Sequence, residues 1–202
     1  MLISFEGIDG CGKTTQIQLL QQRLEREKMP VQILREPGGA MLSEMIRSIL
    51  LNPEIDMNPV TELLLFSAAR SELVASRVNP LLDEKVIVIL DRYFDSTVAY
   101  QGFGRGSLPI GHINQLNEIA SHGREPDITF LLDIEVEEAR KRRESGEEPD
   151  RMERAGDPFY ERVRDGFLYL AEKKSRFVTL EGTLPPKLIH QDIWQHISAM
   201  LR

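Results

Sequence analysis

Hydrophobic residues occur in short runs, and the longer segments between them repeat apolar positions at helical spacing. The runs are "LISF" at 2–5, "VQIL" at 31–34, "VIVIL" at 86–90, "ITFLL" at 128–132 and "FVTL" at 177–180. Uniformly apolar strands that alternate with helices are typical of a parallel sheet covered on both faces. The pattern therefore predicts an α/β fold built on these runs.

Two of the intervening segments show one apolar stripe at helical spacing. The stripe positions are Ile17, Leu20 and Leu24 in the helix from Lys13, and Ile189, Ile193, Ile197 and Leu201 in the last helix. No internal repeat, low-complexity tract or proline-rich linker divides the chain. We therefore expect one domain that covers residues 1–202.

Composition narrows the classes of protein. The 202 residues are 41% hydrophobic and 28% charged, which is ordinary for a globular protein, and no window approaches the apolar length of a membrane span. The net charge of −7 argues against a surface built to grip nucleic acid. The start "MLISFEGIDG" has no basic leader or cleavage site, so we expect a cytoplasmic protein. Cys11 is the only cysteine, which excludes an internal disulfide and a cysteine-based zinc site.

The segment "FEGIDGCGKTTQ" predicts a phosphate-binding loop. Residues 7–14 satisfy G-x-x-x-x-G-K-[ST] between a predicted strand and a predicted helix. Backbone N–H groups of such a loop surround the β-phosphate, Lys13 reaches the β- and γ-phosphates, and Thr14 offers a hydroxyl to Mg²⁺. The predicted ATP-binding residues are Gly7, Ile8, Asp9, Gly10, Cys11, Gly12, Lys13, Thr14 and Thr15.

Two further features distinguish among P-loop proteins, which include switches, motors and small-molecule kinases. No N-K-x-D tetrapeptide for guanine occurs, and "VIVIL" is followed by Asp91-Arg92 instead of Asp-Glu. Asp91 is placed to hold Mg²⁺ through water, and Arg92 to bind a second anion, although a helix cap beside a surface cation would also explain them. Phe66 and Arg70, at i and i+4, could stack on a base and bond its edge, or belong to the core.

A highly charged stretch, "EVEEARKRRESGEEPDRMER" at 135–154, allows two interpretations. It holds six basic and eight acidic residues and is interrupted by Gly146 and Pro149. A solvated helix pair with a turn fits this composition. A mobile lid over a phosphate site fits it as well.

Five blocks in order resemble the bacterial thymidylate kinases. They are "FEGIDGCGKTTQ" at 5–16, "REPGG" at 35–39, "FSAAR" at 66–70, "DRYFDSTVAYQGFGRG" at 91–106 and "PDITFLLD" at 126–133. The resemblance implies a three-layer P-loop kinase fold with a five-stranded parallel sheet of order 2-3-1-4-5, flanked by helices, and a short lid at about 140–155. It also implies phosphorylation of dTMP to dTDP by ATP and Mg²⁺, a step in dTTP synthesis, and a homodimer formed through helices near 40–80 and 93–120.

The resemblance assigns the acceptor site by position. Phe66 matches the thymine-stacking residue, Arg70 the residue that bonds the base, and Arg92 the residue on the dTMP phosphate. Tyr100 would exclude a 2′-hydroxyl. The implied dTMP-binding residues are Asp9, Arg35, Phe66, Arg70, Arg92, Ser96, Thr97, Tyr100 and Gln101. Thr97 and Gln101 have an alternative interpretation as helix-surface residues.

The resemblance also directs attention to the lid arginines. The variable P-loop positions 8–11 hold no cation, so the charge that develops on the transferred phosphoryl group needs one from elsewhere. The chain therefore resembles the subgroup with lid arginines, although acids at Glu144, Glu147 and Glu148 replace a more basic turn. The candidate lid arginines are Arg140, Arg142, Arg143, Arg151 and Arg154, and the resemblance favours Arg143 and Arg151 because "DRMERAG" matches the far flank of the lid. We expect Lys13, Arg92, Arg143 and Arg151 to be catalytic.

Two other functions stay open at this point. One is a kinase for another deoxynucleoside or pyrimidine nucleotide, which an acceptor panel would separate from dTMP phosphorylation. The other is a nucleotide-binding regulator without catalysis, which the complete set of Lys13, Thr14, Arg92 and lid arginines disfavours.

Overall fold

Parallel strands form the centre of the structure, a computed structural model that describes residues 1–143 and 151–201. The strands are β1 (Leu2–Glu6), β2 (Val31–Arg35), β3 (Ile87–Asp91), β4 (Ile128–Asp133) and β5 (Phe177–Glu181). They form one sheet in the order β2-β3-β1-β4-β5, with every neighbouring pair parallel. The predicted strands and their order are confirmed.

Helices connect the strands and cover both faces of the sheet. The α-helices are α1 (Lys13–Arg26), α2 (Met41–Leu51), α3 (Pro59–Leu73), α4 (Asn79–Asp83), α5 (Phe94–Thr97), α6 (Ile110–Ala120), α7 (Val136–Arg143), α8 (Asp157–Lys173) and α9 (Pro186–Met200). Two π-helical segments, η1 (Val74–Val78) and η2 (Val98–Gly104), continue α3 and α5, and a 3₁₀ turn, η3 (Glu153–Ala155), precedes α8.

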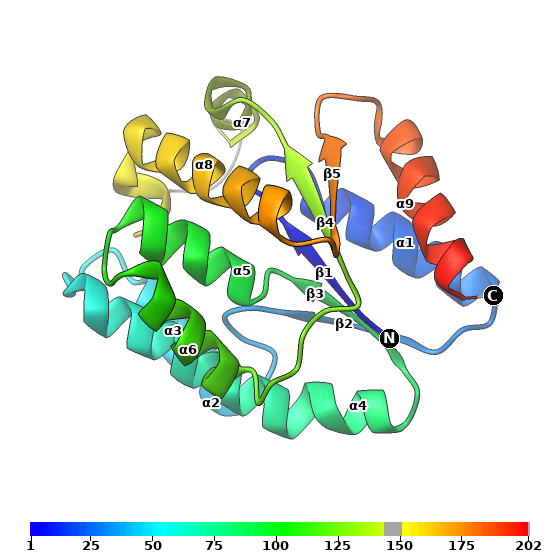
Figure 1. Ribbon diagram of the computed structural model, residues 1–202, viewed down its shortest axis with the longest axis horizontal. Coiled ribbons are helices and arrows are strands. Elements are labelled where there is room, and N and C mark those ends of the chain that lie inside the picture. The colour runs from blue at the N-terminus through cyan, green and yellow to red at the C-terminus, as the bar shows by residue number, and fades with distance from the viewer. Residues whose placement is uncertain (144–150, 202) are drawn as a thin grey trace.

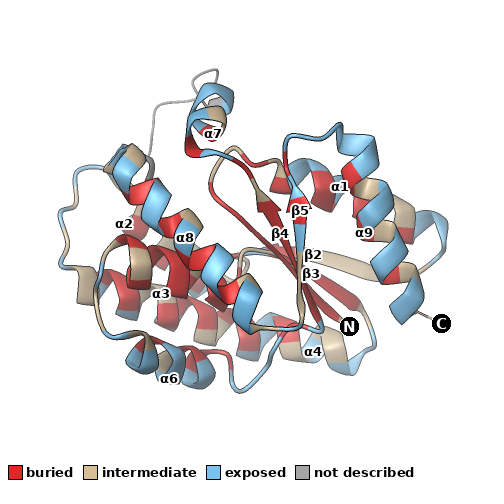
Figure 2. Cartoon of the chain, turned by 45° about the horizontal axis from the view of Figure 1, so that its top comes forward, coloured by how far each residue is buried: buried red, intermediate tan, exposed pale blue. Residues whose placement is uncertain are grey.

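The helices lie in two layers. Helices α1 and α9 lie side by side on one side of the sheet, and α3, α5 and α8 lie on the other (Figure 1). The three central strands, β1, β3 and β4, and the helix faces turned toward the sheet are buried, whereas the edge strands β2 and β5 are only partly buried (Figure 2). The predicted stripes of α1 and α9 face this core; Leu201 follows the end of α9 and packs against the core while only partly buried. None of the helices in residues 1–143 and 151–201 combines the length and apolar character that crossing a membrane requires.

The strand register brings three chain segments together at the carboxyl edge of the sheet. Asp91 at the end of β3 pairs with Phe5 of β1 and with Arg35 of β2. Three segments therefore leave the sheet side by side at this edge: the glycine loop after β1, "REPGG" after β2 and Arg92 after β3. Part of the predicted lid, residues 144–150, lies outside the described residues, and α7 and the 151–155 segment flank it.

Candidate active site

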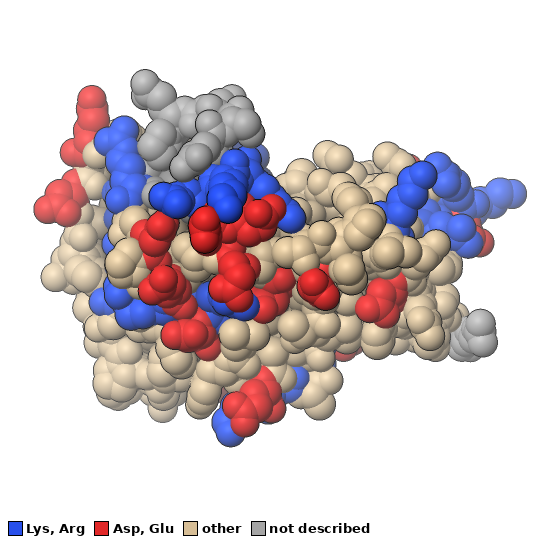
Figure 3. Space-filling model, turned by 90° about the horizontal axis from the view of Figure 1, so that it is seen from above, with Lys and Arg blue, Asp and Glu red and all other residues tan. Residues whose placement is uncertain are grey.

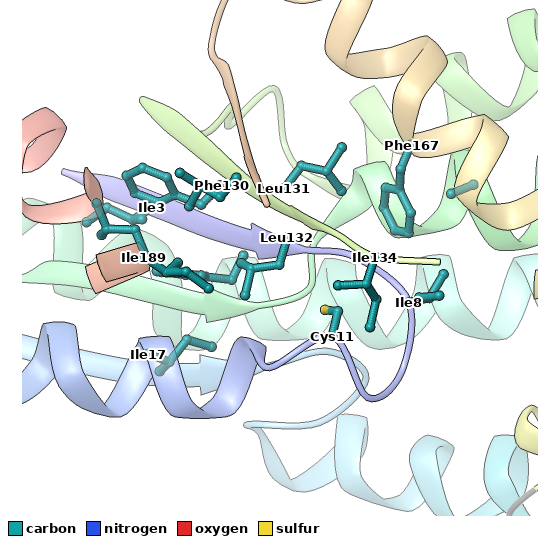
Figure 4. Packing of buried hydrophobic residues seen from close by; sticks show 14 of the residues in the cluster. Ile3, Ile8, Cys11, Ile17, Phe130, Leu131, Leu132, Ile134, Phe167 and Ile189 are labelled. Atoms are coloured by element: carbon teal, nitrogen blue, oxygen red, sulfur yellow. The ribbon is translucent and has the colours of Figure 1, made fainter. Parts of the chain in front are cut away.

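Glycine conformations and two apolar anchors shape the loop between β1 and α1. Gly7, Gly10 and Gly12 have φ of 134°, 89° and 99°, which side chains disfavour, and a Cβ on Gly7 would stand 2.5 Å from the carbonyl oxygen of Leu132. Ile8 and Cys11 are buried in the core, where Cys11 lies near Leu132 and Ile134 (Figure 4). The loop is thus fixed from below while its other face stays open.

Lys13 starts α1 and folds back across this loop. Its ammonium group donates to the carbonyl oxygens of Gly7 at 3.1 Å and Ile8 at 3.2 Å. These weak neutral acceptors hold the cation at the mouth of the loop, where a phosphate oxygen would be a stronger partner.

A cavity of about 700 Å³, called here the nucleotide cavity, opens above the loop. Its size is that of a site for a small ligand. Its walls include Asp9, Gly10, Cys11, Gly12, Lys13, Thr14, Thr15, Arg35, Asp91, Arg142 and the segment 182–186. Of the predicted ATP-binding residues, Asp9 to Thr15 line the cavity, and Gly7 and Ile8 do not.

A second, narrower cavity of about 110 Å³, called here the acceptor cavity, adjoins the first. Eight of the nine residues predicted to bind dTMP line it: Asp9, Phe66, Arg70, Arg92, Ser96, Thr97, Tyr100 and Gln101. The ninth, Arg35, is exposed, pairs with Glu44 at 3.1 Å, and lines the nucleotide cavity instead. Residues common to both cavities are Asp9, Glu36, Arg47 and Arg92. The two ligand spaces therefore meet at these four side chains.

Asp9 and Arg92 form the ion pair at this meeting point. Their closest N–O distance is 2.6 Å, and Asp9 also accepts from the hydroxyls of Tyr100 at 3.0 Å and Tyr160 at 3.2 Å. Burial opposes the charge on Asp9, but Arg92 and Lys13 outweigh it and hold the pKa of Asp9 well below its usual range. The carboxylate is thus ionised at neutral pH.

Arg92 combines an unusual backbone conformation with a side chain that several hydrogen bonds fix. It has a positive φ of 69°, which is unusual for a non-glycine residue, and its guanidinium group donates to the carbonyl of Gly7 at 2.9 Å and to Ser96 at 3.2 Å. Ser96 in turn donates to Glu6 at 2.6 Å, and Glu6 accepts from the backbone of Tyr93 at 2.8 Å. The buried Glu6 thus braces the turn that carries Arg92.

Arg70 reaches the acceptor cavity from α3, whose start is capped by the side chain of Asn58. It is 2% exposed and donates to Glu36 at 2.8 Å, Asn117 at 3.0 Å and Thr97 at 2.8 Å. These three acceptors fix the plane of the guanidinium group. Arginine has five N–H donors, so at least one is left for a ligand.

The predicted lid arginines lie in different places. Lys and Arg side chains gather in one part of the face that Figure 3 shows. Arg151 pairs with the buried Glu62 at 2.6 Å and donates to the carbonyl of Leu50 at 2.7 Å, so it lies outside the nucleotide cavity. Arg142 of α7 lines that cavity and donates to the carbonyl of Gly182 at 3.1 Å. The side chain of Arg143 lies outside the described part of the chain, although α7 ends at this residue.

Several cavity residues were not predicted. They are Glu36, Pro37, Arg47, Leu51, Tyr93 and Met152 in the acceptor cavity, and Gln16, Leu132, Ile189 and the segment 182–186 in the nucleotide cavity. Arg142, which lines the nucleotide cavity, was a candidate lid arginine but not one of the two favoured. The "REPGG" block contained a signal for Glu36 and Pro37. The sequence carried no signal for Arg47, nor for Tyr160, which lines neither cavity but donates to Asp9. An arginine or a tyrosine on an amphipathic helix does not reveal what it faces.

Known proteins match this chain over nearly all of its length. The family model "Thymidylate kinase" matches residues 5–193. The thymidylate kinase of Prosthecochloris aestuarii is 48% identical over 98% of this chain and 92% of its own, and that of Chlorobaculum tepidum is 46% identical over 99% and 98%. A crystal structure of thymidylate kinase from Ehrlichia chaffeensis superposes with a TM-score of 0.79 at 36% identity, covering 98% of both chains. The chain belongs to the thymidylate kinase family.

Proposed function

We propose that the protein transfers the γ-phosphoryl group of ATP to dTMP, giving ADP and dTDP, with Mg²⁺ as cofactor. The observation that carries this proposal is the junction of the two cavities at Asp9 and Arg92. A nucleotide on the glycine loop and a monophosphate in the second cavity would meet there. Transfer between them requires alignment, charge compensation and exclusion of water more than it requires a protein base.

On the nucleotide side, the glycine loop and Lys13 would hold the β- and γ-phosphates. Thr14 and Asp91 both line the nucleotide cavity, and their hydroxyl and carboxylate oxygens are of the kind that Mg²⁺ prefers. The residues thus fit the ion, which Thr14 would hold directly and Asp91 would hold through water. When bound, Mg²⁺ neutralises phosphate charge as the reaction proceeds.

On the acceptor side, Arg92 would hold the dTMP phosphate. Arg47 lines both cavities and is the second cation at their junction, so we assign it the same ligand. Phe66 and Arg70 would contact the base, with Ser96, Thr97, Tyr100 and Gln101 around the base and sugar. Asp9 would lie next to the sugar and phosphate. The exposed Arg35, paired with Glu44, would contribute through the long-range field more than through contact.

The cation that accompanies the transferred phosphoryl group would come from α7 and the lid. Arg142 has the position for it, because it lines the nucleotide cavity. Arg143 and Arg151 stay predictions as catalytic residues. Arg151 would have to leave Glu62 to reach a phosphate.

We also propose a homodimer. Helices α2, α3 and α6 expose large apolar side chains, with Met41 85%, Met45 61%, Leu64 50% and Ile119 72% exposed. A surface of this kind fits a second copy of the chain. Light scattering is expected to give twice the mass of one chain. Met45→Glu is expected to lower this mass toward that of one chain. A wild-type monomer at micromolar concentration would refute the dimer. A cytoplasmic location stays a prediction.

An acceptor panel tests the reaction. Release of ADP is measured with dTMP, dUMP, UMP, dCMP and thymidine at equal concentration, with and without Mg²⁺. Strong preference for dTMP supports the proposal. Preference for another acceptor would favour a different nucleotide or nucleoside kinase, and no turnover with any of them would favour a regulator.

A further inference from the structure

A buried carboxylate, Glu62 of α3, lies behind the acceptor cavity. The residue is 1% exposed and is not part of the cavity wall. It accepts hydrogen bonds from the side-chain amide of Gln101 at 2.9 Å, from Arg105 at 3.3 Å and from Arg151 at 2.6 Å. A buried charge with three donors is costly to assemble, and the phosphate chemistry does not use it.

The partner of Gln101 determines which way its amide points. An ionised carboxylate can only accept hydrogen bonds, so Glu62 must receive the NH₂ end of the amide. Gln101 is 2% exposed and lines the acceptor cavity, whereas Glu62 lies outside it. The carbonyl oxygen of Gln101 is therefore the polar atom that its side chain offers to the cavity.

Arg70 and Gln101 together then present a donor and an acceptor. Arg70 lines the same cavity and has at least one N–H group beyond its three bonds to Glu36, Asn117 and Thr97. Thymine and uracil present a carbonyl acceptor next to the N3–H donor, which complements this pair. Cytosine presents an amino donor next to an N3 acceptor, so a donor would face Arg70 and an acceptor would face the carbonyl oxygen of Gln101.

We propose that Glu62 is a positioning residue for base selection. Its carboxylate fixes the amide of Gln101 with the carbonyl oxygen toward the acceptor base. Thymine and uracil, which present an N3–H donor, are then accepted, and cytosine is rejected. The proposal rests on the proposed function, because it assumes that a pyrimidine monophosphate occupies the acceptor cavity. Arg105 and Arg151 compensate the buried charge that the device requires.

The substitution Glu62→Gln tests the device. The new amide can offer NH₂ to Gln101, whose own amide can then rotate and present NH₂ to the base. The ratio of kcat/KM for dTMP to that for dCMP is expected to fall by about tenfold or more, since each polar mismatch costs about one such factor. Glu62→Asp keeps a group that only accepts, so its ratio is expected to stay near that of the wild type.

A double-mutant cycle shows whether Glu62 acts through Gln101. Gln101→Met removes the amide, and adding Glu62→Gln to it is expected to change the dTMP to dCMP ratio no further. Arg105→Lys is the matched control, because it changes another partner of the same carboxylate and leaves the amide in place. Its ratio is expected to be that of the wild type.

Three outcomes separate the possible failures. A folded Glu62→Gln protein that loses turnover with dTMP and dCMP equally would overturn the positioning role and leave a structural one. A wild-type enzyme that does not phosphorylate dTMP would refute the proposed function itself. If Glu62→Gln does not fold, ¹⁵N NMR of the wild type decides: the Gln101 NH₂ signal, assigned by its loss in Gln101→Met, must show slow hydrogen exchange before dTMP is added. If the Gln101 NH₂ group is protected from hydrogen exchange only after dTMP is added, the proposal is overturned.

Discussion

Asp9 of the glycine loop and Arg92 after β3 form an ion pair of 2.6 Å where the nucleotide and acceptor cavities meet. The pair joins two segments that are 83 residues apart in sequence. Each residue lines both cavities, so a charge on either ligand acts on both members of the pair. The guanidinium group also donates to the carbonyl of Gly7 and to Ser96, which fixes its plane.

Arg92→Lys tests the importance of that plane. Lysine keeps the charge but loses the fork that can hold a phosphate with two bonds. We expect KM for dTMP to rise by about tenfold or more, with a smaller change in KM for ATP. Steady-state kinetics with each substrate varied in turn would measure this, with Arg26→Lys on the exposed side of α1 as control. Equal rises in both KM values would contradict an acceptor role.

Lys13→Ala is expected to abolish turnover and leave dTMP binding largely intact. Lys13 lines the nucleotide cavity and not the acceptor cavity, so its loss removes a cation from the β- and γ-phosphates, while Asp9 keeps its ion pair with Arg92. ADP release and calorimetric titration with dTMP would measure the two effects, and Lys173→Ala on α8 is the control. Loss of dTMP binding to the same degree as turnover would refute this division of roles.

Arg142 and Arg151 should behave differently when each is replaced by methionine. Arg142→Met is expected to raise KM for ATP and lower kcat, because Arg142 lines the nucleotide cavity. Arg151→Met is expected to lower the free energy of unfolding by about 1–3 kcal/mol, because it removes a donor from the buried Glu62. Kinetics and urea denaturation of both variants would test this. A large fall in kcat for Arg151→Met without loss of stability would instead support its catalytic role.

Glu6 makes stability depend on pH. Burial and the nearby charge of Asp95 raise the pKa of Glu6 from 4.5 to about 8. The folded protein therefore holds this proton more tightly than the unfolded chain does. The contribution of Glu6 to stability is complete below about pH 4.5 and is lost as the pH rises through about 8.

Glu6→Gln is therefore expected to be stabilised relative to the wild type at pH 9 and little changed at pH 5. The glutamine resembles the protonated acid and can still accept from the backbone of Tyr93. Urea denaturation at both pH values would measure the difference, with the exposed Glu84→Gln as control. A difference that does not grow with pH would show that Glu6 is not protonated in the folded protein.

Two helical glycines give a matched test of packing. A Cβ on Gly166 of α8 would stand 2.9 Å from the Cα of Ala99, whereas a Cβ on Gly111 of α6 would meet nothing within 4 Å. Gly166→Ala is expected to lower the free energy of unfolding by about 1–3 kcal/mol, because α8 must move away from η2. Gly111→Ala is expected to be neutral or stabilising by up to about 1 kcal/mol, from helix propensity alone. Thermal unfolding of both would show it, and equal effects would contradict the close approach of α8 to η2.

The strands, the glycine loop and most residues of the acceptor site could be predicted from the order of the amino acids. Each has a local cause: an apolar run predicts a buried strand, the spacing of glycines predicts a loop that surrounds phosphate, and Phe66 and Arg70 share a helix face because they are four residues apart. The strand order of the sheet and the prediction of dTMP as acceptor rest on the resemblance of five sequence blocks to the thymidylate kinases.

The ion pairs of the site, in contrast, could not be predicted without the folded arrangement of the chain. The pairs of Glu36 with Arg70, Glu62 with Arg151 and Asp9 with Arg92 join segments far apart in the chain, and their formation depends on how the helices pack on the sheet. The same holds for Arg142, which lines the nucleotide cavity, and for Arg35, which does not line the acceptor cavity. Residue type and spacing set what a side chain can bind, but packing sets what it faces, because a charged group takes the partner that folding brings within reach.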